Sequence, residues 1–179
     1  MADFSKKETN KSMMRPTPKK WESAREDMYK INIDGAFKST TNKGGWGFIV
    51  RNSVGAFLEG GCGNLCRVTT SFQAKALAAL YSLERAALSG MTRIILETDA
   101  TELVRGLTSE DLDHSIDGIL LKQIRDLIES DFVYCEIQHC PRNCNKVADC
   151  LAMYGASVVS GLISVHESSP HFYFRPGLQ

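Results

Sequence analysis

Three aspartates and one histidine stand at predicted element ends, where side chains able to do chemistry can gather. Asp34 and Asp99 each end a predicted strand, His139 follows another, and Asp149 lies early in the last predicted helix. An ionised carboxylate inside a sheet is costly unless it is paired or bound to a metal, whereas one at a strand end reaches the rim of the fold. Gathered together, these side chains would form a site for cations. Each aspartate alone also fits an ordinary strand-ending turn.

The strands that must hold these side chains are predicted from hydrophobic periodicity. In the first strand, Tyr29, Ile31 and Ile33 alternate with polar residues, which is typical of a strand with one apolar face. The first three strands are joined by turn sequences, including residues 38–45, and therefore indicate an antiparallel meander. The predicted strands comprise residues 29–37, 46–52, 57–63, 93–99 and 132–138.

A long helix follows the meander. Thr70 and Gln73 have capping-box spacing, and the sequence then runs on alanine and leucine to Leu88. Because the middle of this helix carries little charge, we expect it to be covered on two sides. Further helices are predicted at residues 100–107, 116–128 and 145–158, the last with Asn145 as cap. The apolar side of the 116–128 helix comprises Ile116, Ile119, Leu120, Ile124, Leu127 and Ile128, and the apolar line of the last helix comprises Val147, Leu151, Tyr154 and Val158.

This order of elements predicts an α/β fold with a mixed five-stranded sheet, three antiparallel strands followed by two parallel ones, and helices on both faces. The first, fourth and fifth strands are then parallel neighbours, so their carboxyl ends lie at one edge of the sheet. Asp34, Asp99 and His139 belong to that edge, and the helix that carries Asp149 must start from it. The topology alone therefore predicts that three carboxylates and a histidine converge.

Length and composition fit one domain with a proper core, since the chain has 179 residues and 43% of them are hydrophobic. We expect a flexible basic tail at residues 1–24, the domain at 25–159 and a C-terminal tail at 160–179. The sequence contains neither a long apolar run nor an apolar N-terminal region. We therefore expect no membrane span and no secretory signal, and an intracellular monomer in the nucleus or cytoplasm.

The formal net charge is zero, but it is unevenly distributed. Residues 1–20 hold six basic and two acidic side chains, which leaves the remainder of the chain with fifteen basic and nineteen acidic ones. An acidic remainder of the chain argues against general electrostatic binding of phosphate backbones. It fits a site that gathers carboxylates and needs cations to approach nucleic acid. The basic tail is expected to be solvated, although its side chains could touch nucleic acid.

Five sequence motifs follow one another along the chain: I-N-I-D-G-A-F, W-G-F-I-V-R-N, T-T-S-F-Q-A-K-A-L-A-A-L, L-E-T-D-A and H-C-P-R-N-C-N-K-V-A-D-C-L-A. They span roughly residues 30–158 and resemble the ribonuclease H fold. Their amino-acid sequences are similar to those of plant ribonuclease H-like domains found alone or at the end of retroelement reverse transcriptases. The resemblance implies binding of RNA–DNA hybrids and Mg²⁺-dependent cleavage of the RNA strand by water.

In that family four carboxylates hold two divalent ions, with a mobile histidine nearby. Asp34, Asp99, Asp149 and His139 match the family positions, but Lys75 stands where a glutamate should be. The exchange moves the carboxylate site from about −4 to about −2, and at about 4 Å and an effective dielectric near 20 each pair of unit charges repels by about 4 kcal/mol, which Mg²⁺ doubles. We therefore expect one magnesium ion rather than two, and impaired catalysis.

Several alternatives stay open for Lys75. It pairs with Asp34 or Asp99 in an inert site, it leaves one functional metal and weak activity, or it contacts the phosphate in place of the missing ion. A slipped helix register would instead let Glu97 serve, although a sheet residue with a polar partner is the plainer interpretation of Glu97. For the whole chain, the alternatives are an active Mg²⁺-dependent hybrid endoribonuclease and a non-catalytic protein-interaction scaffold.

The resemblance also implies where nucleic acid would be held. Gly35, Thr70 and Ser71 occupy places where family members hold a hybrid through backbone amides, and Arg142 and Lys146 are the clustered basic residues at the active edge. Some members add a basic handle between the middle helices, but the corresponding loop here, S-E-D-L-D-H-S-I-D, is acidic. We therefore expect binding that is weak and steeply dependent on salt.

The six cysteines are expected to be free thiols. Cys62 and Cys66 precede the long helix, and Cys140 and Cys144 precede the last one. A four-thiolate Zn²⁺ site is conceivable if the two loops meet, but both spacings are loose for such a site. Zinc is therefore not the expected metal.

Overall fold

The computed structural model describes residues 20–158, 162–166 and 173–175. The strands are β1 (Tyr29–Lys38), β2 (Lys43–Arg51), β3 (Phe57–Leu65), β4 (Arg93–Thr98), β5 (Tyr134–His139), β6 (Leu162–His166) and β7 (Tyr173–Arg175). The helices are α1 (Ser71–Leu88), α2 (Thr101–Thr108), α3 (Gly118–Asp131) and α4 (Lys146–Ser157), with a short 3-10 turn at Arg142–Cys144. None of the helices in these described ranges has the length and apolar character needed to cross a bilayer.

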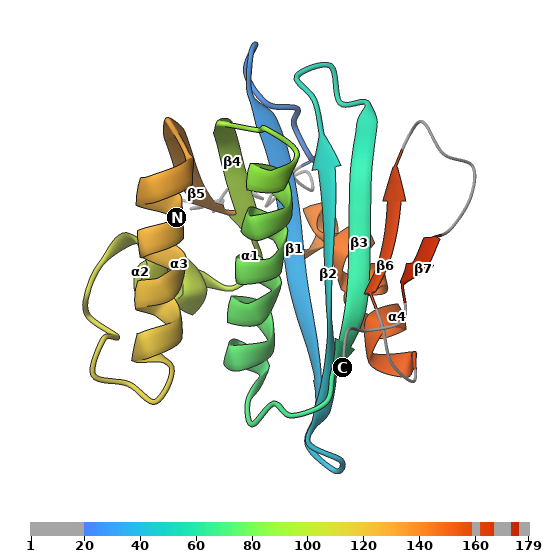
Figure 1. The fold of residues 1–179 in the computed structure, drawn as a ribbon, viewed down its shortest axis with the longest axis vertical. Coiled ribbons are helices and arrows are strands. Elements are labelled where there is room, and N and C mark those ends of the chain that lie inside the picture. Colours follow the sequence, from blue (N-terminus) through green and yellow to red (C-terminus); the bar gives the residue numbers. More distant parts are fainter. Residues whose placement is uncertain (1–19, 159–161, 167–172, 176–179) are drawn as a thin grey trace, which may run out of the picture.

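The strands form one sheet in the order β5-β4-β1-β2-β3-β6-β7 (Figure 1). β1, β2 and β3 pair antiparallel, while β4 pairs parallel with both β1 and β5. The predicted α/β fold, with three antiparallel and two parallel strands, is therefore confirmed for β1 to β5. β6 and β7 continue the sheet beyond β3 within the segment expected to be a tail, and the division of the chain into domain and tails stays a prediction.

Helices cover both faces of the sheet. α1 packs against β1 and β2 on one face and contacts α2 and α3 on its other side, while α4 packs against β1, β2 and β3 on the opposite face (Figure 1). The main core lies under α1 and contains Ile31, Ile33, Phe48, Leu83 and Ile94, all at most 1% exposed. The alternation predicted for the first strand accounts for this, because its isoleucines face α1, whereas Lys30 and Asn32 on the other face contact Glu22 and Trp21.

Two glycines of β2 let α4 approach the sheet backbone directly. A Cβ atom at Gly47 would lie 2.4 Å from the backbone nitrogen of Ala152, and one at Gly45 would lie 2.1 Å from that of Ala156. No side chain fits at such distances, so the helix rests on the strand through main-chain contacts. This close packing fixes where the first turn of α4, with Asp149, meets the end of the sheet.

The apolar line predicted for the last helix is therefore wrong in part. The buried residues of α4 are Ala148, Ala152 and Gly155. Val147 is 44% exposed and Tyr154 is 53% exposed. Small residues make the contact because the helix lies too close to the sheet for larger side chains, which are held outward.

The third helix also differs from its prediction. It begins at Gly118 rather than at Ile116, and Ile116 and Ile119 are each 87% exposed. The helix buries Ile124, as predicted, together with Leu121. The predicted Leu120, Leu127 and Ile128 also pack against the core. The apolar residues at the start of this segment extend past the edge of the core, so helical spacing alone misassigned them.

The second strand begins three residues before its predicted start, because glycines that suggested a turn belong to the sheet. Gly44 and Gly45 pair with Phe37 and Ala36 of β1. A Cβ atom at Gly44 would lie 2.3 Å from the carbonyl oxygen of Ala36, so the glycine marks a close approach within the strand. The turn proper is limited to residues 39–42.

Candidate active site

An open pocket at the carboxyl ends of β1 and β4 brings together most of the predicted residues. Asp34 comes from β1, Lys75 from α1, Asp99 directly follows β4 and Asp149 lies in the first turn of α4. Arg142 lines the same pocket. Asp34 lies inside β1 rather than at its end, contrary to the prediction. It meets Asp99 because β1 and β4 pair in parallel and both strands run toward this edge.

The Lys75 ammonium lies between two of the carboxylates. Its Nζ is 2.6 Å from Oδ1 of Asp34 and 2.5 Å from Oδ1 of Asp99. The carboxylate side chains are only 5% and 11% exposed, so these ion pairs are largely shielded from water. Of the alternatives for Lys75, pairing is the arrangement that the structure contains, and it engages both aspartates.

A glycine explains why Lys75 reaches Asp34. A Cβ atom at Gly35 would lie 2.3 Å from the carbonyl carbon of Ala74, so the first turns of α1 touch β1 immediately beside Asp34. Thr70 fixes the start of α1 by accepting a hydrogen bond from the backbone N–H of Gln73 at 3.0 Å. Gly35 itself donates its N–H to the Asp34 carboxylate at 2.8 Å.

The ionisation of this cluster follows from burial and pairing together. Burial raises the pKa of Asp34, and hydrogen bonding to Lys75 only partly offsets that effect. Burial lowers the pKa of Lys75, but the hydrogen bonds and charges of Asp34 and Asp99 outweigh it and leave this pKa above its ordinary value. Lys75 is thus a protonated cation at neutral pH and cannot act as a metal ligand.

The residues present do not fit a divalent ion between Asp34 and Asp99. The Lys75 ammonium occupies the position between their Oδ1 atoms that such an ion would take. Among residues 20–158, 162–166 and 173–175, no three His, Cys, Asp or Glu side chains are arranged to hold a metal ion. The single magnesium ion expected from the sequence stays a prediction.

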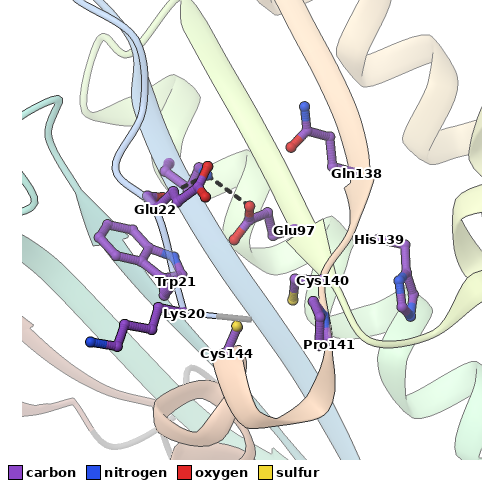
Figure 2. Close-up of a pocket in the computed structure, with 10 residues that line it drawn as sticks. Lys20, Trp21, Glu22, Glu97, Gln138, His139, Cys140, Pro141 and Cys144 are labelled. Carbon is purple, nitrogen blue, oxygen red and sulfur yellow. Dashed lines mark hydrogen bonds and ion pairs between the residues drawn. The ribbon is translucent and has the colours of Figure 1, made fainter. Parts of the chain in front are cut away.

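Some of the predicted residues lie outside this pocket. His139 is exposed at the end of β5 and lines a neighbouring pocket with Cys140 and Cys144 (Figure 2). Lys146 is exposed at the first residue of α4, and Thr70 is the cap of α1. Gly35 and Ser71 do line the pocket. The end of a strand fixes the position of a residue's backbone, but it does not fix the direction of its side chain.

Glu97 does not replace the missing glutamate. Its carboxylate lies 2.8 Å from the Lys30 ammonium and accepts a hydrogen bond from Asn32 at 2.8 Å. The residue is 6% exposed and lies under the N-terminal segment (Figure 2). Its interpretation as a sheet residue with a polar partner is the one that the structure supports.

The cysteines are all free thiols, as predicted. Cys140 and Cys144 share one pocket that neither Cys62 nor Cys66 lines. Burial raises the pKa of Cys62 to about 11 and that of Cys140 to about 12, so both stay protonated at neutral pH. Thiols held in this form are poor metal ligands.

Asn145 connects the two halves of the site and was missed as a site residue. Its side-chain amide donates to the backbone carbonyl of Ile33 at 2.8 Å, next to Asp34, and its own backbone carbonyl accepts the N–H of Asp149 at 3.1 Å. Asn145 is the N-cap residue of α4, as predicted, but its side chain makes no cap hydrogen bond to the helix. Within the described part of the chain, its buried Oδ1 has no hydrogen-bond donor. The feature of the sequence that could have identified Asn145 is its position as a polar residue just before the last helix.

Replacing Lys75 with glutamine is expected to raise the pKa of Asp34 further, because burial persists while the cation is lost. A folded pKa above the unfolded value adds stability that is fully present below the unfolded pKa and disappears as pH rises through the folded pKa. Stability of the variant should therefore fall more steeply than that of the wild type as pH rises from about 4. Carboxyl NMR titration and thermal unfolding at several pH values test this; parallel pH profiles would contradict it.

Comparisons with known proteins place this geometry in context. The profile of a family described as reverse transcriptase-like matches residues 32–155. The chain is similar to RNase H1 from Halobacterium salinarum NRC-1, with a TM-score of 0.61, 25% identity and coverage of 72% of this chain and 96% of that one. No curated protein sequence gives a significant match.

Two further solved structures share the fold. The N-terminal RNase H domain of a Mycobacterium tuberculosis protein matches with a TM-score of 0.66 and 22% identity over 72% of this chain and 93% of that one. LC11-RNase H1, isolated from compost and solved in complex with an RNA/DNA hybrid, matches with a TM-score of 0.66 and 17% identity over 72% and 96%.

Proposed function

Because this chain belongs to the reverse transcriptase-like family, whose profile covers residues 32–155, we propose that it is a ribonuclease H-like domain that binds RNA–DNA hybrids and in which Lys75 impairs catalysis. The fold is that of the RNase H neighbours, one of which was solved with a hybrid bound. The monomeric state, the nuclear or cytoplasmic location and the likeness to plant and retroelement domains stay predictions.

The observation that carries the proposal is the double ion pair of Lys75. Hydrolysis at a carboxylate site requires carboxylates that are free to take a proton or to hold a cation. Here Asp34 and Asp99 both contact the same ammonium at 2.6 and 2.5 Å. Breaking a buried pair on one side leaves an uncompensated charge, so the pairs are not readily exchanged for another cation. The two ion pairs of Lys75 do not include Asp149 or Glu102, which line the same pocket.

Binding of a phosphate backbone is supported by the cations around the pocket. Arg142 lines it directly, and Lys146 is exposed nearby at the start of α4. Ser71 and Gly35 line the same pocket. Because the body of the chain is acidic overall, few phosphates can be neutralised, and the affinity should be weak and sensitive to salt.

We expect hybrid binding that does not depend on magnesium, because a cation supplied by the protein already lies between the carboxylates. Fluorescence polarisation with a labelled RNA–DNA hybrid should give affinities within about twofold in Mg²⁺ and in EDTA, and Arg142→Gln should reduce the slope of log affinity against log salt by about 0.9 per lost phosphate contact. Duplex DNA and single-stranded RNA serve as comparison ligands.

Two outcomes would replace this proposal. If none of these nucleic acids binds, the interaction-scaffold alternative gains support. If the unmodified protein cleaves the RNA of the hybrid in Mg²⁺ or Mn²⁺, and Asp34→Asn abolishes that cleavage, the chain is an active ribonuclease.

A further inference from the structure

A groove lies between the C-terminal turns of α1 and α3. The two helices are in contact and run side by side, with both C-terminal ends at the top of Figure 1. The groove is lined by Glu84, Ala87 and Leu88 of α1 and by Leu127 and Asp131 of α3, and its volume is about 530 Å³. It is called here the α1–α3 groove. Two helices that end next to each other therefore form one concave surface.

The groove exposes apolar surface that the core does not use. Leu88 is the last residue of α1 and is 81% exposed. Ala87 and Leu127 are half-buried and pack against the main core with the covered part of their surface. A single exposed leucine is ordinary on a protein surface, but this one lies beside two other apolar side chains in a concave setting. The groove can thus take up apolar side chains from another molecule.

Acidic side chains flank this apolar surface. Glu84 and Asp131 line the groove and are exposed, and Glu129, also exposed, lies in the same last turn as Asp131. The basic residue in the last turn of α1, Arg85, forms an ion pair with the buried carboxylate of Glu59. The last turn of α3 contains no basic residue. Among the described residues that line the groove, the charged ones are thus all negative.

The acidic residues of α3 oppose the electrostatics of their own helix. The C-terminal end of a helix carries partial negative charge, so acidic side chains there destabilise it and basic ones stabilise it. Asp131 accepts a hydrogen bond from the hydroxyl of Ser130 at 2.9 Å, but a neutral donor does not cancel its charge. Side chains that break a local rule of stability are expected at functional sites. A cationic partner would offset the cost of Glu129 and Asp131.

We propose that the α1–α3 groove is a docking site for a basic amphipathic helix of a partner protein. The apolar face of that helix contacts Leu88 and Leu127, and lysines or arginines beside it pair with Glu84 and Asp131. A helix whose apolar face lies in a groove is a common mode of peptide recognition. Nucleic acids and anionic membranes carry the same sign of charge as the groove and are repelled from it.

The groove and the candidate active site lie at opposite ends of α1. Lys75 belongs to the first turns of this helix and Leu88 ends it. At a rise of 1.5 Å per residue, the stretch from Lys75 to Leu88 spans about 20 Å. Both surfaces can therefore be occupied at the same time. The inference goes beyond the proposed nucleic-acid binding and does not depend on it.

Fluorescence polarisation with the full chain and labelled synthetic peptides tests the proposal. The probe is a helical peptide of about fifteen residues, made of alanine, leucine and lysine, with one line of leucines between two lines of lysines. A second peptide has glutamate in place of every lysine, and a third has serine in place of every leucine. We expect the probe to bind at least about tenfold more tightly than either of the others.

Two variants of the groove should change this preference. The double variant Glu84→Lys and Asp131→Lys should weaken binding of the probe by about tenfold or more and let the glutamate peptide bind instead, because it reverses the charge of the rim. Leu88→Gln should weaken binding of the probe by about fivefold, because it removes the exposed apolar contact while keeping every charge. All three positions are exposed or at the surface of the groove, so the fold is expected to persist.

Matched controls lie at the other end of α3. The double variant Glu110→Lys and Asp111→Lys changes the net charge equally, and Ile119→Gln removes an equally exposed apolar side chain. Both should bind the probe as the wild type does. If these controls lose binding as the groove variants do, general charge rather than the groove attracts the peptide, and the inference is overturned. Equal binding of all three peptides to the wild type would also overturn it.

Two further measurements address the groove directly. Asp131→Lys should raise the melting temperature by about 1–3 °C, because it places a cation at the negative end of α3. A lower melting temperature would mean that Asp131 serves the fold and would contradict its assignment to a partner. Saturating probe should leave the affinity for an RNA–DNA hybrid within about twofold. Competition between the two ligands would place the probe at the candidate active site and overturn docking in the groove.

Discussion

Replacing Lys75 with glutamate is expected to raise Mg²⁺-dependent cleavage of an RNA–DNA hybrid by about 100-fold or more over the wild type, which corresponds to about 2.7 kcal/mol in the barrier. The change removes the ammonium that lies 2.6 and 2.5 Å from the two aspartates and adds a fourth carboxylate. Each pair of unit charges at about 4 Å interacts by about 4 kcal/mol at an effective dielectric near 20. Replacing lysine with glutamate changes the charge of the site by two units, so the electrostatic change is larger than the expected change in the barrier.

Two measurements make this result specific. Calorimetric titration should show tighter Mg²⁺ binding to Lys75→Glu than to the wild type under the same conditions. Lys75→Gln is the matched control, because it removes the cation without adding a carboxylate and should gain much less activity. Asp34→Asn added to Lys75→Glu should abolish the gain. A folded Lys75→Glu protein that binds Mg²⁺ but still fails to cleave would locate the defect elsewhere.

Gly47→Ala is expected to destabilise the fold by about 3 kcal/mol, the upper end of the usual cost of overpacking. The added Cβ atom would lie 2.4 Å from the backbone nitrogen of Ala152, so relief requires α4 to move away from the sheet. The melting temperature should fall by about 6–12 °C for a domain of this size. Because Gly47 pairs with Asp34 in the sheet, a shift of α4 also disturbs the candidate site.

Gly60→Ala provides the control in the neighbouring strand. Its added Cβ atom would lie 3.3 Å from the nearest atoms, which include the flexible ring of Phe57, so we expect a cost below about 1.5 kcal/mol. Thermal unfolding followed by circular dichroism compares the two variants. Equal melting temperatures for Gly47→Ala and the wild type would show that α4 tolerates displacement and that its contact is not tight.

The sequence was informative where the backbone pattern decides the outcome. Asp34 and Asp99 could be placed together because the crossover connections indicated parallel pairing of their strands, and β1 and β4 do pair parallel. The apolar run Ile94 to Leu96 likewise indicated a strand covered on both faces, and all three residues are buried. The roles of the aspartates in metal or nucleic-acid binding stay predictions.

The sequence was less informative where close contact decides. Lys75 reaches both aspartates because Gly35 lets α1 touch β1, and no periodicity reports the separation of a helix from a strand. Val147 and Tyr154 continue an apolar spacing yet are exposed, because glycines in β2 draw α4 in too closely for large side chains. Trp21 lies in a polar stretch that suggested a free tail, and only its partner Asn32, eleven residues later, explains its position.

The strands β6 and β7 change which edge of the sheet is exposed to other protein molecules. β6 pairs with β3 from Glu59 to Gly63, a glycine-rich stretch whose amides would otherwise offer a template for another chain. The rim of the sheet passes instead to β7, which has only three residues. A short edge strand gives a second molecule little length along which to pair, so at this edge of the sheet the arrangement disfavours strand addition from another chain.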